Sequence, residues 1–128
     1  MKRIVLLCAL SIITVWPLAA CSNEVKMQHT SEKPTALDVL GEDSTADIFQ
    51  LNDTIYKSDV KWAEKTEVTK SKKVGEIKKM SSDQYDFDNG TATKLSKGTV
   101  IYSTKERNEI LLVSFKGKLK KYVALGEG

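Results

Sequence analysis

From residue 48 to the C-terminus, short runs of β-branched, aromatic and other apolar residues alternate with turns rich in Gly, Asn, Asp and Ser. Short runs with closely spaced turn signals are typical of antiparallel sheets, whereas a parallel sheet would need long helical segments between its strands. No such helical segments appear in this region. We therefore predict a mainly β domain at residues 48–128, folded as a small antiparallel sandwich or barrel-like sheet.

Two hairpins carry the clearest local signals. Asn52-Asp53 separates the runs 48–51 and 54–57, and both residues tolerate a positive φ angle, which favours a two-residue turn. Lys116-Gly117-Lys118 indicates a second hairpin after the run 110–115. That run is apolar on both faces, as expected of a central strand covered on two sides.

The middle of the domain is less regular. Residues 60–64 fit either a strand or a helical turn, Ser71-Lys72-Lys73 is typical of a loop, and residues 74–80 are predicted to form a strand. The predicted core consists of apolar and aromatic strand residues: Phe49, Tyr56, Trp62, Val74, Ile77, Ile101, Leu112, Val113, Phe115, Tyr122 and Val123.

The first twenty residues have a different composition. Lys2 and Arg3 precede a thirteen-residue, almost wholly apolar run at 4–16, and small residues follow. This order is that of a signal peptide, and the run is too short to span a bilayer. The sequence Leu18-Ala19-Ala20-Cys21 resembles the lipobox of bacterial lipoprotein precursors.

The lipobox resemblance implies a location and an anchor. It implies cleavage after residue 20, a diacylglyceryl thioether on Cys21, and an N-acyl chain such as palmitate on the same residue. Several acyl chains hold a protein stably at a membrane, so the predicted location is the extracytoplasmic face of the cell membrane. The only other cysteine, Cys8, would leave with the signal peptide, so no disulfide is expected.

Four segments of the domain carry a second resemblance: 52–56, 74–77, 92–102, and 116–118 before Tyr122. In these segments the chain is similar to a recurrent small domain in lipoproteins of Gram-positive, Bacillus-like bacteria. This resemblance implies the β fold and an envelope location, and it implies no particular chemistry.

Residues 21–47 differ from the domain in charge and in pattern. Residues 22–47 are polar, lack aromatic side chains and carry a net charge of −4, whereas residues 48–128 carry +5. We predict a flexible spacer after the lipidated cysteine, in which 35–40 has helical character but is too short to be stable alone. The basic domain could favour anionic lipids or wall polymers, although lysines spread along the chain are more typical of a solvated surface.

The sequence holds few candidates for chemistry. The single histidine, His29, lies in the predicted spacer, and the domain has neither histidine nor a glycine-rich phosphate loop. Asp83, Asp86 and Asp88 precede Gly90 at a spacing that partly matches a calcium loop, but the loop lacks the bidentate glutamate. A hairpin loop explains the same residues, so we expect no metal, no cofactor and no enzymatic activity.

Three aromatic residues are candidates for a binding surface. Trp62 lies between Lys61 and Lys65, and Tyr85 and Phe87 lie in the polar loop 83–90. Interface anchors are enriched in such side chains.

These features predict a lipid-anchored, non-enzymatic cell-surface binding protein. Its expected partner is an envelope protein or an anionic wall polymer, and no nucleic acid is expected outside the cell. One concrete form is an exclusion or immunity lipoprotein of a mobile element. An inhibitor of a secreted hydrolase and a structural wall-binding module are alternatives that the sequence leaves open.

Overall fold

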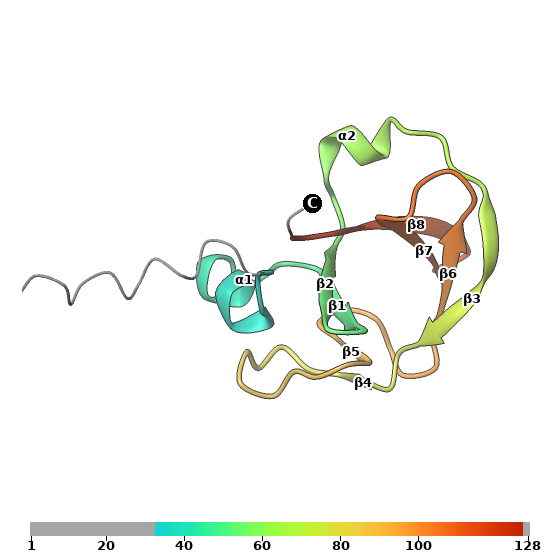
Figure 1. The fold of residues 1–128 in the computed structure, drawn as a ribbon. Helices are drawn as coiled ribbons and strands as arrows, with labels where there is room; N and C mark the ends of the chain where they lie inside the picture. The colour runs from blue at the N-terminus through green and yellow to red at the C-terminus, as the bar shows by residue number, and fades with distance from the viewer. Residues whose placement is uncertain (1–32, 127–128) are drawn as a thin grey trace, which may run out of the picture. The chain divides into compact units, whose positions relative to one another are not determined.

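A computed structural model describes residues 33–126 of the chain (Figure 1). The predicted signal peptide at 1–20, the lipidation site Cys21 and His29 lie outside the described residues. Within the described part, no helix is long and apolar enough to cross a membrane. Residues 32–128 form a compact unit by themselves.

The described residues form one eight-stranded sheet, accompanied by two short helices. The strands are β1 (Ile48–Leu51), β2 (Thr54–Lys57), β3 (Lys70–Glu76), β4 (Lys79–Met80), β5 (Thr91–Ala92), β6 (Val100–Thr104), β7 (Ile110–Phe115) and β8 (Lys118–Ala124), and the helices are α1 (Ala36–Glu42) and α2 (Lys61–Glu64). Their order is β3-β6-β7-β8-β2-β1-β5-β4. Every neighbouring pair is antiparallel except β4 and β5. The predicted mainly β, barrel-like fold is confirmed.

The two edges of the sheet are joined by a two-residue connection. β3 and β4 lie at opposite ends of the strand order, yet only Ile77 and Lys78 separate them in sequence. The Ile77 N–H donates to the Thr99 carbonyl at 2.8 Å, and the Lys78 N–H donates to the Gly90 carbonyl at 2.7 Å. Residues 70–80 therefore run from one edge to the other as one bent segment, and the sheet is curled (Figure 1). Ile77, within this segment, is fully buried.

Both predicted hairpins are confirmed. Asn52 and Asp53 have φ angles of 51° and 65°, and Lys116 and Gly117 have φ angles of 51° and 79°. Two successive positive φ angles match the right-handed twist of the flanking strands. As predicted, β7 is a central strand: it pairs with β6 and β8, and its first four residues are buried.

The main buried cluster lies inside the curled sheet. Seven of the eleven predicted core residues are buried, five of them in this cluster. Val74 and Trp62 are 41% and 45% exposed, so their prediction as core was wrong. Val74 lies on the edge strand β3, and Trp62 lies on a helical turn rather than in a strand. Tyr56 and Phe115 are half-buried.

The folded unit begins before residue 48. Helix α1 starts with a reciprocal capping box between Thr35 and Asp38, and Leu40 packs in a buried cluster with Ile48 and Ile55. The described part of the predicted spacer, residues 33–47, is therefore structured. A helix this short is marginal alone, and burial against the sheet supplies the stabilisation that it lacks.

The structure also corrects the middle of the chain. The predicted loop 71–73 belongs to β3, and the predicted strand 74–80 is divided by Ile77 and Lys78 between β3 and β4. All four residues from Lys70 to Lys73 are exposed. Lysines commonly protect edge strands from pairing with further strands. Because three of these four residues are lysines, the segment lacks the alternation of apolar and polar residues by which a strand is recognised in a sequence.

A candidate binding groove beside Trp62

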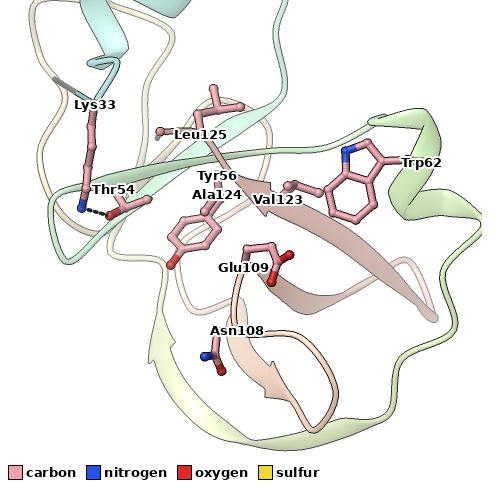
Figure 2. Close-up of a pocket in the computed structure, with 10 residues that line it drawn as sticks. Lys33, Thr54, Tyr56, Trp62, Asn108, Glu109, Val123, Ala124 and Leu125 are labelled. Atoms are coloured by element: carbon pink, nitrogen blue, oxygen red, sulfur yellow. Dashed lines mark hydrogen bonds between the residues drawn. The ribbon is translucent and has the colours of Figure 1, made fainter. Parts of the chain in front are cut away.

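A groove of about 570 Å³ opens where α2, β2 and the end of β8 meet the loop between β6 and β7 (Figure 2). Its lining combines apolar and aromatic side chains with a few polar ones. The lining residues are Lys33, Thr54, Tyr56, Trp62, Asn108, Glu109, Val123, Ala124, Leu125 and Gly126. Ligand sites share this composition, in which polar groups set orientation at an apolar surface.

Trp62 stands at the groove on a firmly held helical turn. The neighbouring Ala63 is fully buried against Ile110 and Val123. The Lys121 ammonium donates to the carbonyls of Ala63, Glu64 and Thr66 at 3.1, 3.2 and 2.7 Å. A cation at the carbonyl end of a helix stabilises it. The backbone that carries the half-exposed indole is therefore held in place by the packing of Ala63 and by the Lys121 hydrogen bonds.

An ion pair lies next to the indole. The Arg107 guanidinium lies 5.1 Å from the centroid of the Trp62 ring, within range of a cation–π contact. It also donates to Oε2 of Glu109 from Nε, at 3.1 Å, and from Nη2. These hydrogen bonds hold the pKa of Glu109 below its usual value. Glu109 therefore lines the groove as a carboxylate, oriented by Arg107.

Tyr56 forms the central part of the lining. Its ring stacks on the fully buried Phe49, with 5.2 Å between centroids and an interplanar angle of 17°. Burial raises the pKa of Tyr56, so its phenol stays neutral at ordinary pH. Figure 2 shows the ring between Thr54 and Glu109. A second hollow of about 220 Å³ shares Tyr56 and Asn108 with the groove.

The structure separates the predicted binding residues. Trp62 lines the groove, whereas Tyr85 and Phe87 do not. Tyr85 is 79% exposed on the loop 83–90, and Phe87 packs against the cluster beneath α1. The three aromatic residues therefore do not form one surface.

The carboxylates of loop 83–90 are engaged with other groups. Asp83 accepts from the Tyr85 N–H at 2.9 Å, and Asp86 and Asp88 lie 2.7 and 3.9 Å from the Lys79 ammonium. The hydrogen bond to Asp86 is the main cause of the raised pKa of Lys79. Among residues 33–126, no group of three or more His, Cys, Asp or Glu side chains is placed to hold a metal ion.

Sequence reasoning missed most of the groove. Asn108 and the neighbouring Arg107 belong to a predicted polar turn at 105–108, Glu109 is predicted to be a solvated glutamate, and Val123 is predicted to be core. The one signal was the spacing of Arg107 and Glu109, which permits an ion pair but does not indicate a neighbouring indole. Lys33 reaches the groove through a 3.0 Å hydrogen bond to Thr54 (Figure 2), across 21 residues.

Among the described residues that line the groove, Glu109 is the only carboxylate, and it is paired with Arg107. Comparison of the chain with protein-family models, with curated proteins and with solved structures found no match.

Proposed function

We propose that this protein is a lipid-anchored, non-enzymatic binding protein at the extracytoplasmic face of the cell membrane. Its groove beside Trp62 would engage a segment of an envelope protein. The observation that carries the proposal is the indole of Trp62, 45% exposed on a turn that Ala63 and Lys121 hold in place. A rigid, exposed tryptophan loses little conformational entropy on binding and is a common interface anchor.

The rest of the groove supports a protein ligand. Tyr56, Val123 and Leu125 offer apolar surface, while Glu109, which also lines the groove, forms a charged pair with Arg107. Protein interfaces combine a central apolar anchor with a polar rim in this way. The groove is also large enough for several side chains of an extended segment.

The anchor rests on the lipobox, so it needs its own test. Cells producing the chain are labelled with radioactive palmitate, and the chain is recovered and counted. We expect label in the wild-type chain and none in the Cys21→Ala variant. Equal labelling of the two chains would refute an anchor at Cys21.

The groove is tested by photo-crosslinking on intact cells. A photoreactive amino acid replaces Asn108, which lines the groove without contributing its apolar floor. We expect one discrete protein adduct, reduced roughly 30-fold by Trp62→Ala, since anchor residues contribute about 2 kcal/mol or more. Tyr85→Ala is the matched control, because Tyr85 is exposed but lies outside the groove.

The outcomes are distinct. An adduct that Trp62→Ala and Tyr85→Ala reduce equally, or no adduct from a folded chain, would refute binding in the groove. The adduct's identity then assigns the role: a membrane component supports exclusion or immunity, and a secreted enzyme supports inhibition of a hydrolase.

A further inference from the structure

We propose that the tip of the β7–β8 hairpin, residues 115–120, docks on the anionic headgroups of the membrane to which the chain is anchored. This inference uses the membrane location of the proposed function but not the groove. The tip would hold the domain in one orientation, which a tether at the N-terminus alone does not do. Four features of the tip support it.

The first feature is uncompensated positive charge. Lys116 and Lys118 have no carboxylate within ion-pair distance among residues 33–126. Lys120, in contrast, pairs with Asp47 at 2.6 Å. The Lys116 and Lys120 ammonium groups lie 5.3 and 5.1 Å from the Phe115 ring centroid. Two cations therefore remain for an external anion.

The second feature is apolar surface among these cations. Leu119 is 52% exposed, and Phe115 is half-buried. Together with Lys116, Lys118 and Lys120, they line a hollow of about 420 Å³ made only of tip residues. A hydrated polyanion gains little binding free energy from contact with an exposed leucine. The boundary between headgroups and acyl chains, in contrast, buries apolar side chains and attracts cationic ones. This combination favours a lipid surface over a wall polymer.

The third feature is the backbone. Lys116 has a φ angle of 51° in a turn position where Asn, Asp or Gly is strongly preferred. A lysine is strained in this left-handed region, and such strain is commonly retained at functional positions. The strained turn places Lys116 between β7 and β8, where the hairpin reverses direction.

The fourth feature is reach. Lys33 lines the groove together with Ala124, at the end of β8 opposite the tip. Strand β8 has seven residues, a length of about 23 Å. The chain from Cys21 to Lys33 spans at most about 40 Å. The tether is therefore long enough for the tip to touch the membrane in which Cys21 would be anchored.

The first test uses residues 32–128 without the anchor. These residues form a compact unit, and the described part of that unit contains three clusters of buried residues. The sedimentation of this unit is measured with vesicles of phosphatidylcholine alone, or of equal parts phosphatidylcholine and phosphatidylglycerol. We expect binding only to the anionic vesicles, and an affinity about 30-fold lower for Lys116→Gln/Lys118→Gln.

A matched control separates the tip from general charge. Lys72→Gln/Lys105→Gln removes the same charge at the other end of β6 from the tip. We expect this variant to bind at least tenfold more tightly than the tip variant. Equal losses from the two pairs, or no binding to anionic vesicles, would overturn the inference.

The second test uses the full lipidated chain in the anionic vesicles. A photoreactive amino acid replaces Leu119 or, as a matched control, Leu37, which is 45% exposed on α1. We expect a phospholipid adduct at position 119 and at least fivefold less at position 37. Flotation of the vesicles reports the anchor separately. If the chain floats with the vesicles but gives equal phospholipid adducts at positions 119 and 37, docking of the tip is refuted and the lipid anchor is not.

Discussion

At the scale of single residues, the strain at Lys116 has a measurable cost. Asparagine tolerates a φ angle of 51° better than lysine, so we expect Lys116→Asn to raise the free energy of unfolding by about 0.5 to 1 kcal/mol. Lys118→Asn removes the same charge from a strand, where asparagine is disfavoured, and should give no gain. Urea unfolding of both variants checks this, and equal effects would rule out backbone strain at residue 116.

Tyr122 links stability to alkaline pH. Its hydroxyl donates to Asp47 at 2.8 Å, and burial, followed by the Asp47 charge, raises the pKa of Tyr122 above its usual 10.0. Because the pKa of Tyr122 is higher in the folded state than in the unfolded state, the protonated phenol contributes stability below pH 10.0. This contribution is lost progressively as the pH rises above 10.0. We therefore expect stability to fall above pH 10.0 in the wild type and to fall less steeply in Tyr122→Phe.

At neutral pH, we expect Tyr122→Phe to lower the free energy of unfolding by about 1 to 3 kcal/mol. Asp47 then loses the Tyr122 hydrogen bond and, among the described residues, keeps only Lys120 as a side-chain partner. Urea unfolding across pH measures both effects. Tyr85→Phe is the control: Tyr85 is 79% exposed, and its substitution should change neither quantity. An unchanged alkaline slope in Tyr122→Phe would contradict the assignment.

At the scale of elements, α1 is part of the folded unit rather than of a spacer. Leu40 is 4% exposed and packs with Ile48 and Ile55. We expect Leu40→Ala to lower the free energy of unfolding by about 2 to 4 kcal/mol. Leu37→Ala on the same helix removes a leucine that is 45% exposed, and should cost much less. Similar small losses in both would show that α1 does not contribute to the core.

Helix α2 depends on a lysine from β8. Lys121→Met keeps an unbranched side chain only one atom shorter but removes three hydrogen bonds to carbonyls at the end of α2. In residues 32–128, Trp62 is the only tryptophan, so its fluorescence reports this turn. We expect lower anisotropy in Lys121→Met and no change in Lys118→Met. Unchanged anisotropy would mean that packing of Ala63 alone holds the indole.

At the scale of the whole molecule, Ile77 stabilises the connection between the two edges of the sheet. It is fully buried in the main cluster and is one of the two residues that join β3 to β4. We expect Ile77→Ala to lower the free energy of unfolding by about 2 to 5 kcal/mol and to leave a single unfolding transition, because the main cluster joins residues of β1, β5, β6, β7 and β8. Val74→Ala, at a 41% exposed position on β3, should cost far less. Two separate transitions would contradict a single cooperative unit.

Local chemistry made part of this fold predictable. The turn at Asn52-Asp53 follows from residues that tolerate positive φ, and the central position of β7 follows from its apolar run. Strand β3 was less predictable, because it is an edge strand that pairs on one side only and most of its residues, including three lysines, are exposed. The site was the least predictable part: Trp62 was a binding candidate, but its neighbours Arg107 and Glu109 lie more than forty residues away in sequence.

By itself, the sequence determined the β class, the two hairpins and the expectation of a lipid anchor, because each depends on residues close together in the chain. Only the tertiary structure decided that α1 packs on the sheet, that residues 70–80 join its edges, and that Trp62 faces a groove. These features depend on contacts between distant segments. Their stabilisation comes from burial and from hydrogen bonds that exist only once the whole sheet has assembled.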